Sequence, residues 1–345
     1  MKKYIISIIV ACAIIILLVP VGYSQNLQKL AQTGMKFLSV STDARVSGMA
    51  DAVTAVEGYS TSMFYNPSAM AKMPGFADFS FGKIDWIADI KYVYGSAAFS
   101  PAQGRYGVFG FTALSVDYGN LMGTVRDDDP NNQLGYIETG AFSPSAMAFG
   151  IGYSKALSSK FAVGGNLKYV IQDMGSSVIG LTGAAAEGNF SRKNYSTSVL
   201  AFDFGVLYNT GFRSLNIGMC IRNFSQEVTY EDEGFQLPLT FRIGVAMDLL
   251  DVYPLLSKEY SSLILSVDAT HPRDYPEQLN VGLEYMFYKT FSLRLGYSAP
   301  NDEHGFSTGL GFQQAYRNYM VGVDYAYTPF GAFSDVHRFS VHFAL

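Results

Sequence analysis

The most regular feature of the chain is an alternation of bulky apolar residues with small or polar ones. Leu200, Phe202, Phe204, Val206 and Tyr208 alternate with Ala201, Asp203, Gly205 and Leu207. A period of two is typical of β-strands whose two faces meet different surroundings. Comparable runs cover residues 76–86, 88–99, 105–117, 142–157, 159–172, 195–209, 213–223, 238–250, 261–269, 277–288, 291–298, 305–314, 317–327 and 336–345. They predict fourteen strands, an even number, as single-chain bacterial barrels have.

Two features favour a membrane barrel over a soluble β-sandwich. Runs such as Arg105–Tyr118 and Tyr195–Asn209 exceed the ~5–6 residues of ordinary strands and match the ~9–11 needed to cross a bilayer. The last run alternates to the final residue, Leu345, as does the terminal strand that outer-membrane barrels present for insertion. We therefore expect an all-β fold, a closed antiparallel transmembrane β-barrel over residues 76–345, with its bulky face toward lipid and its small or polar face lining the lumen.

Residues 43–74, which precede the alternation, have a different pattern. Apolar residues at helical spacing predict a helix over Ala44–Val56, and a second short helix is predicted to begin at Pro67 with Asn66 as its N-cap. Fourteen strands lie between the eight that fill their own interior and the sixteen or more that leave a water channel. We therefore expect residues 25–75 to form a small, partly helical plug; a tail outside the barrel is the alternative.

The expected plug and lumen face carry the candidate site residues. Around the plug motif Asn66-Pro67, Met63, Phe64, Met70 and Met73 offer an apolar, deformable surface. The lumen-facing charges predicted on the strands are Lys168, Arg222, Arg242 and Arg294 against Asp203, Glu284 and Asp324. Charges of both signs indicate ion pairs inside a filled barrel rather than a selectivity ring of one sign.

The first 24 residues have the pattern of a cleaved signal peptide. Lys2 and Lys3 precede the apolar run Tyr4–Val19, and small residues stand before Gln25. A membrane anchor is one alternative, although the run is shorter than the ~20 residues of a span. A lipoprotein signal at Cys12 is another. Cleavage before Gln25 removes two lysines from 24 basic residues and none of the 29 acidic ones, which leaves a net charge of −7.

Composition supports export to the outer membrane. The acidic mature chain argues against nucleic acid as a partner. Only Cys220 remains after cleavage, which excludes an internal disulfide. Charged residues make up 15% of the chain, against ~25% in ordinary soluble domains, and aromatic residues also reach 15%. This combination is typical of an outer-membrane barrel.

Three patterns raise the question of metal binding or catalysis. Asp127, Asp129, Asn131, Gln133 and Glu138 have the spacing of a calcium loop, but Asn132 replaces its glycine and Pro130 interrupts it, so we expect a solvated acidic loop with calcium as the alternative. The four histidines share no metal-ligand spacing. Ser266, Asp268 and His271 suggest a lipid deacylase, but they lack a nucleophile elbow. We expect no catalytic residue, metal or cofactor.

Several stretches resemble one known family. TGMKFLSVSTDARVSGMADAVTAV, followed by SMFYNPSAMA, is similar to the PorV/PorQ family of FadL-like outer-membrane proteins. Further similarities are IRNF, LPLTFRIG, VDATHPRD, VGLEY, SLRLGY and HRFSVHF, so the resemblance covers residues 33–345. It implies a fourteen-stranded barrel whose N-terminal plug ends in an Asn-Pro motif. The PorV branch is a component of the type IX secretion system that holds cargo, and FadL relatives move long-chain hydrophobic molecules.

Two functions therefore stay open, both without catalysis. In the first, the long connections Tyr118–Ala141, Gly175–Asn194 and Ser225–Leu237 hold secretion-system proteins and secreted cargo at the outer membrane. In the second, the barrel carries a hydrophobic small molecule or lipid, and the Met-rich plug is its binding surface. Outer-membrane lipid is an expected partner in both, and nucleic acid in neither.

Overall fold

The chain folds as a closed antiparallel barrel of fourteen strands, as the sequence predicts. The computed structural model describes residues 33–127, 130–179, 191–252, 256–301, 305–331 and 333–345. The barrel strands are β1 (Ala77–Asp85), β2 (Lys91–Phe99), β3 (Val108–Asp117), β6 (Ser145–Ala156), β7 (Phe161–Ile179), β8 (Ser191–Asn209), β9 (Asn216–Ser225), β12 (Thr240–Asp248), β13 (Ser261–Pro272), β14 (Gln278–Phe287), β15 (Phe291–Ala299), β16 (Phe306–Tyr316), β17 (Tyr319–Thr328) and β18 (Val336–Ala344). Each strand pairs with its barrel neighbours in the chain, and β1 pairs with β18 to close the cylinder.

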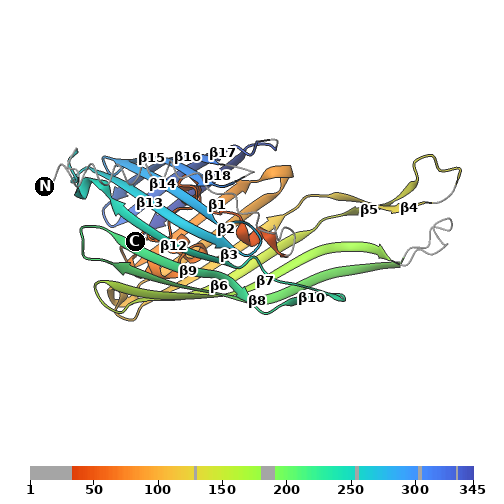
Figure 1. Cartoon of the computed structure of the whole chain (residues 1–345), viewed down its shortest axis with the longest axis horizontal. Coiled ribbons are helices and arrows are strands. Elements are labelled where there is room, and N and C mark those ends of the chain that lie inside the picture. The colour runs from red at the N-terminus through yellow and green to blue at the C-terminus, as the bar shows by residue number, and fades with distance from the viewer. Residues whose placement is uncertain (1–32, 128–129, 180–190, 253–255, 302–304, 332) are drawn as a thin grey trace.

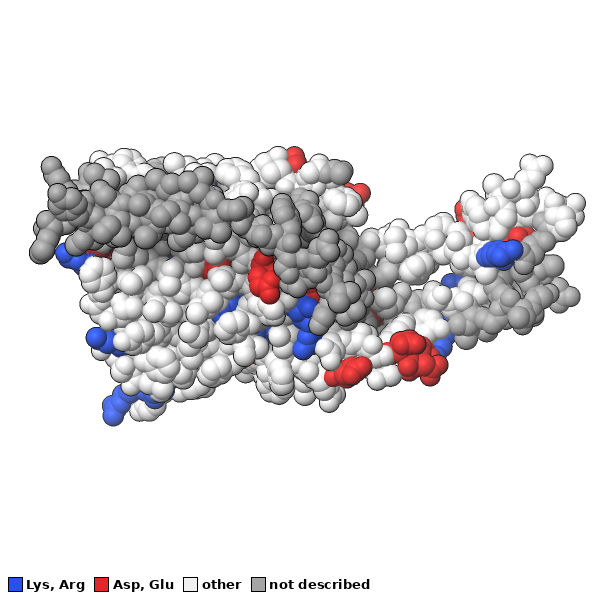
Figure 2. All heavy atoms as spheres, viewed as in Figure 1, with Lys and Arg blue, Asp and Glu red and all other residues white. Residues whose placement is uncertain are grey.

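The two faces of the strands differ as the alternation predicts. On β8, Phe202 and Phe204 are 51% and 56% exposed, whereas the alternating residues Ala201 and Asp203 are buried. Many large apolar and aromatic side chains are exposed on the outward face. Few acidic or basic side chains appear on the described part of the barrel wall in Figure 2, and basic residues mark one end of the barrel. The outward face is therefore suited to lipid and the inward face to a packed interior.

The connections at the two ends of the barrel differ in length. Tight turns join β6 to β7, β8 to β9, β14 to β15 and β16 to β17 at the end that also holds Leu345. At the opposite end, β7 and β8 extend beyond the barrel together with a separate hairpin of β4 (Leu121–Arg126) and β5 (Tyr136–Phe142) (Figure 1). Outer-membrane barrels have short periplasmic turns and longer external loops, so we expect the long-loop end to face the outside.

The prediction of loops at the long-loop end was partly wrong. Residues 118–141 contain β4 and β5, residues 225–237 contain β10 (Val228–Tyr230) and β11 (Glu233–Phe235), and residues 175–194 include the ends of β7 and β8. These stretches are rich in the turn-forming residues Gly, Asn and Asp, and their strands are short or interrupted. Apolar and polar residues therefore do not alternate over a run long enough to predict a strand.

Residues 33–75, which we call the luminal segment, run through the inside of the barrel. The segment contains four one-turn or two-turn helices: η1 (Lys36–Ser39), α2 (Ala44–Ser47), η2 (Ser60–Phe64) and η3 (Pro67–Lys72). Helix α2 packs against β16, β17 and β18, whereas η3 packs against β6, β7 and β8 on another wall (Figure 1). No helix of the described residues is long and apolar enough to cross a membrane.

Of the two helices predicted in this segment, the start of the second is confirmed and the length of the first is wrong. Asn66 caps η3 through its side-chain oxygen, which accepts from the backbone N–H of Ser68, and Pro67 is the first helical residue, as predicted. The helix predicted over Ala44–Val56 is wrong in length, since α2 ends at Ser47. Ala50 and Asp51 take positive φ angles of 49° and 61°, which an α-helix does not allow.

Candidate functional site

The most extensive polar network in the lumen joins the luminal segment to three strands. Arg45 of α2 binds Glu284 of β14 with two hydrogen bonds of 2.8 Å, from Nε to Oε2 and from Nη2 to Oε1. Arg294 of β15 donates to the same Oε2 at 2.6 Å and to Asp324 of β17 at 2.6 Å. Glu284 is fully buried. Two guanidinium groups and two carboxylates balance each other, as buried charges require.

A second network lies on the other wall of the lumen. Lys168 of β7 contacts Asp203 of β8 at 2.8 Å and donates to the side-chain oxygen of Asn223. The backbone N–H of Asn223 donates to Asp203 at 2.8 Å, and Asn166 donates to the other carboxylate oxygen at 3.2 Å. Of the seven predicted lumen charges, the structure therefore brings five into close ion pairs, in two groups.

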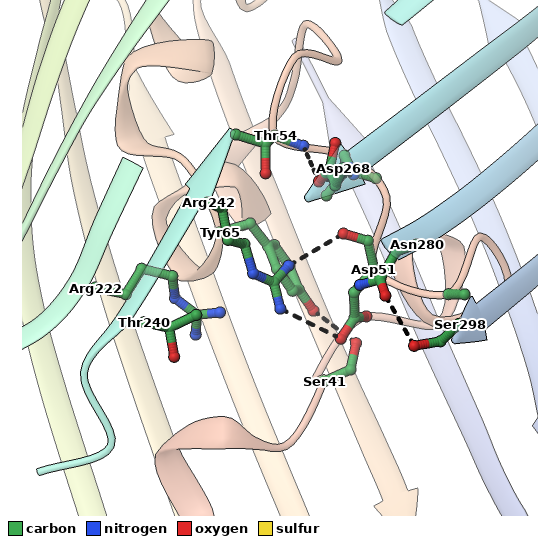
Figure 3. Close-up of polar contacts among 12 residues, drawn as sticks. Ser41, Asp51, Thr54, Tyr65, Arg222, Thr240, Arg242, Asp268, Asn280 and Ser298 are labelled. Carbon is green, nitrogen blue, oxygen red and sulfur yellow. Dashed lines mark hydrogen bonds and ion pairs between the residues drawn. The ribbon is translucent and has the colours of Figure 1, made fainter. Parts of the chain in front are cut away.

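Arg222 and Arg242 are inward-facing but are held differently. Arg242 donates to the backbone carbonyl of Asp51 at 3.1 Å, and its guanidinium lies 3.9 Å from that residue's carboxylate (Figure 3). Arg222 contacts the carbonyl of Leu38 at 3.5 Å and lies over the ring of Tyr65, 5.6 Å from its centroid. In the described part of the chain, Arg222 forms no ion pair.

The plug motif lies where the luminal segment crosses β8. Asn66 donates to the carbonyls of Thr54 and Val206 at 2.6 and 3.3 Å, which ties two stretches of the segment to the barrel. Met63, Met70 and Met73 pack with Ala98 and Val108 in one buried cluster, and Phe64 packs edge-on against Tyr94. The Met residues thus fill space between η2, η3 and the wall.

Backbone N–H groups of the segment are satisfied by side chains of the barrel. Asp268 of β13 accepts from the N–H groups of Val53 and Thr54 at 3.1 and 2.9 Å (Figure 3). Asp78 of β1 accepts from the N–H of Ser60 at 2.7 Å. Short helices leave several N–H groups without an internal partner, so these carboxylates fix the segment at two further points.

Tyr65 anchors the segment to itself. Its hydroxyl oxygen accepts from the backbone N–H groups of Thr42 and Asp43, each at 3.0 Å. Burial raises the pKa of Tyr65 to about 12, so the hydroxyl stays protonated at neutral pH. Asp43 in turn caps α2 through the N–H of Val46 and accepts from the hydroxyl of Tyr94. The turn before α2 is therefore bound both to Tyr65, the residue after η2, and to the wall.

Inward-facing glycines let the backbone of the segment touch the wall. A Cβ added at any member of this set would lie 2.1–2.7 Å from a backbone atom of the segment: Gly164, Gly218, Gly282 and Gly296. At Gly322, which also faces inward, the nearest atom to such a Cβ is 3.5 Å away. The sequence shows these residues only as strand glycines; the fold makes four of them close-approach points.

A cavity of about 630 Å³ lies in the half of the lumen next to the long loops. The luminal segment forms one side of it, and the wall includes residues of β9, β12, β13 and β18 near the long loops. Lys36, Arg222, Arg242 and Arg338 line it, with Asp51 and Asp274 as the acidic residues. Two smaller spaces between segment and wall, and one within the segment itself, measure about 20–30 Å³ each, which is room for about one water molecule.

The residues weighed for catalysis do not form a reactive group. Ser266 and Asp268 are buried on the inward face of β13, whereas His271 lies on the outward side with an exposed side chain and contacts Glu277 at 3.1 Å. Ser266 donates to the carbonyl of Val245. In the residues that the structure describes, no group of three or more His, Cys, Asp or Glu side chains is placed to hold a metal ion.

The acidic stretch weighed for calcium belongs to the projecting hairpin. Glu138 lies on β5, and Asn132 donates to the Asp127 carboxylate at 2.7 Å within the turn. Asp129 lies outside the described residues, as do the predicted signal peptide over residues 1–24 and residues 25–32. The calcium alternative is therefore not tested.

Three residues important to the lumen were not among the predicted ones: Arg45, Asp268 and Arg338. Arg338 stands between the outward-facing residues His337 and Phe339, so the alternation on β18 places it inside. Asp268 alternates in the same way on β13. Arg45 gives no such signal, because its partner Glu284 is 239 residues away in the sequence.

Comparison with known proteins gives a family and a fold. Residues 133–343, more than half of the chain, match the family model described as type IX secretion system membrane protein PorP/SprF. A search of curated proteins finds no match.

Solved structures with the same fold are outer-membrane barrels. The monoaromatic hydrocarbon channel CymD is 12% identical, with a TM-score of 0.55 over 88% of this chain and 97% of its own. The toluene transporter TodX of Pseudomonas putida is 12% identical, with a TM-score of 0.52 over 85% and 96%. A FadL homologue of Pseudomonas aeruginosa is 11% identical, with a TM-score of 0.51 over 88% and 98%. At these identities the likeness shows the FadL-like fold alone.

Proposed function

Since this chain belongs to the PorP/SprF family of type IX secretion system membrane proteins, we propose that it holds or shuttles secreted cargo at the outer membrane. The observation that carries the proposal is a lumen crossed by the luminal segment, combined with strands that project beyond the barrel. A barrel that binds a protein partner without transporting it needs no open channel, but it needs a binding surface outside the membrane. The ends of β7 and β8 and the β4–β5 hairpin offer that surface (Figure 1).

In this proposal residues 25–75 are a plug, residues 76–345 are the barrel, and residues 1–24 are a signal peptide removed on export. The contacts of the luminal segment support the plug. Arg45 with Glu284, Asn66 with Val206, and Asp268 with the backbone of Thr54 tie it to three different strands. A tail outside the barrel would make none of these contacts, and its many buried side chains would be exposed.

The sequence resemblance and the family model point to different branches of the type IX secretion proteins. The resemblance read from the sequence is to PorV/PorQ, whereas the matching family model is PorP/SprF. Type IX secretion is common to both names. The PorV-like role, in which the barrel holds cargo that carries a C-terminal secretion signal, remains part of the proposal.

The alternative function is transport of long-chain hydrophobic molecules. It is favoured by the fold, which this chain shares with barrels named as hydrocarbon channels and a toluene transporter. The lining of the large cavity favours it less. Four basic side chains and several hydroxyl and amide groups line the cavity beside apolar residues such as Phe37, Trp86 and Ile90, and a hydrocarbon would have to displace water from the polar groups.

Affinity purification separates the two functions. We would tag the full-length protein, extract it in mild detergent, and compare it with a variant in which residues 121–142 are replaced by a short turn. The barrel should tolerate this change, because β4 and β5 pair only with each other. We expect secreted proteins and secretion-system proteins with the intact protein and a clear loss with the variant.

Two outcomes would contradict the cargo role. One is equal recovery of secreted proteins with the variant and with an unrelated tagged barrel. The other is a stoichiometric hydrophobic molecule in the purified barrel with no protein partner, which would favour transport.

A further inference from the structure

The large cavity at the long-loop end carries more positive charge than its carboxylates balance. Lys36 pairs with Asp274, and Arg242 pairs loosely with Asp51 at 3.9 Å. Arg222 and Arg338, which are 8% and 2% exposed, form no ion pair with any described residue. The other luminal networks, by contrast, match each buried cation to a carboxylate at 2.6–2.8 Å.

The guanidinium groups also keep unused hydrogen-bonding capacity. The Nε atoms of Arg222 and Arg242 are buried and have no hydrogen-bond partner in the described part of the chain. A buried arginine without a carboxylate lowers stability, because it loses hydration and gains no compensating partner. Such an arrangement at a cavity is expected where an anionic ligand completes it.

The arginines already show which kind of ligand they hold. Each binds a backbone carbonyl of the luminal segment: Arg222 that of Leu38 at 3.5 Å, Arg242 that of Asp51 at 3.1 Å, and Arg338 that of Ser41 at 3.1 Å. Asn280 and Ser298, which bond to each other at 2.8 Å, add amide and hydroxyl groups to the wall (Figure 3). These groups suit a polypeptide backbone, and apolar lining residues such as Phe37, Trp86 and Ile90 suit its side chains.

We propose that this cavity binds an acidic peptide segment that enters from the long-loop end. Carboxylates of the peptide pair with Arg222 and Arg338, which reach the cavity from opposite walls of the barrel, and its backbone bonds to the amide and hydroxyl groups of the wall. The volume of about 630 Å³ lies within the ~300–1,000 Å³ of ordinary ligand sites. The inference does not depend on the secretion role, since peptide binding and cargo recovery are measured separately.

The chain contains a built-in reporter of the site. Trp86 is the single tryptophan of the sequence, lines the cavity, and lies under the guanidinium of Arg338, 5.3 Å from the ring. Its fluorescence in the purified full-length protein in detergent should change when the cavity is occupied. The probes are a short capped peptide with two adjacent glutamates, the same peptide with glutamines, and inorganic phosphate.

We expect a saturable change in Trp86 emission with the glutamate peptide alone. Arg222→Gln should weaken its binding roughly tenfold or more, because a desolvated charge pair is lost. The matched control is Arg213→Gln in the tight turn between β8 and β9 at the opposite end, which should leave binding unchanged. Equal binding of the glutamine peptide, an equal response to phosphate, or no saturable change with any probe would overturn the proposal.

Thermal unfolding without any peptide gives an independent measurement. Arg222→Gln should unfold at the same or a higher temperature than the parent protein, because it removes a buried charge that has no carboxylate partner. The glutamate peptide should raise the unfolding temperature of the parent and not of the variant. A variant that unfolds at a clearly lower temperature would show that Arg222 supports the fold, and the proposal would fail.

Discussion

The inward-facing glycines at which the luminal segment touches the wall allow a direct test of how the lumen is closed. A Cβ at Gly296 would lie 2.3 Å from the backbone N of Ala50 and 2.5 Å from the carbonyl carbon of Met49. At Gly164 it would lie 2.5 Å from backbone atoms of Pro67 and Ser68. The contacted atoms are backbone, so they cannot rotate away. Gly296→Ala or Gly164→Ala must therefore shift the segment or the strand.

The expected cost follows from the general cost of overpacking. One methyl group forced into a packed interior costs about 1–3 kcal/mol. If the luminal segment is the part that yields, its closed state loses that free energy, and open states become roughly 5–160 times more frequent. Gly322→Ala is the matched control, because its Cβ would meet its nearest neighbour at 3.5 Å, an ordinary contact. The control also accounts for the general effect of Gly→Ala on the unfolded chain.

The assay is single-channel conductance in planar bilayers, with thermal unfolding of the same samples. We expect the parent protein and Gly322→Ala to conduct rarely, and Gly296→Ala and Gly164→Ala to open more often and unfold earlier. If Gly322→Ala conducts and unfolds like Gly296→Ala and Gly164→Ala, the segment does not seal the barrel through these contacts. The same follows if none of the four proteins conducts and all are equally stable.

Four further results are expected. Glu284→Gln should lower the free energy of unfolding by about 3–5 kcal/mol, because two buried guanidinium groups lose their carboxylate, whereas Glu277→Gln on the surface should change it by less than about 0.5 kcal/mol; similar losses would refute the role of the network. Phe204→Arg should cost about 2–4 kcal/mol if the side chain lies near the bilayer midplane, and Phe204→Leu much less, as judged by heat-modifiability on gels; equal assembly would mean that this face does not meet lipid. Deleting residues 43–74 should give large, steady conductance if the barrel still folds, and unchanged conductance would place the segment outside the current path. N-terminal sequencing of the outer-membrane fraction should find a chain that starts near Gln25, and an uncleaved or soluble protein would contradict export by a signal peptide.

The inward positions of β8 are unsuitable for a control variant of Phe204→Arg. Arginine at Ala201 or Gly205 would be a poor inward control for Phe204→Arg, because Ala201 is fully buried and a Cβ at Gly205 would lie 2.0 Å from the side-chain oxygen of Asn66. Inward positions of this barrel are occupied by the luminal segment, so a large side chain there meets protein rather than water.

The sequence by itself determined the features that depend on near neighbours. Alternation along each run predicts the strands, their number and their two faces, because a strand turns successive side chains to opposite sides. The same rule places Lys168, Glu284 and Arg294 inside. The Asn66-Pro67 pair predicts the start of η3, because a cap and a proline act within one turn.

Only the tertiary structure decided which of these inward residues meet. Arg45 binds Glu284 across the lumen, and Gly296 lies against the backbone of Ala50. Neither contact can be predicted from the local sequence. The helix predicted over Ala44–Val56 ends at Ser47, and the segment takes positive φ angles at Ala50 and Asp51, where Ala50 lies against Gly296 of the wall. The surplus of positive charge around Arg222 and Arg338 is likewise a property of the closed barrel, since strands far apart in the chain bring those side chains to one cavity. Periodicity acts over a few residues, whereas a closed lumen joins residues that are hundreds apart.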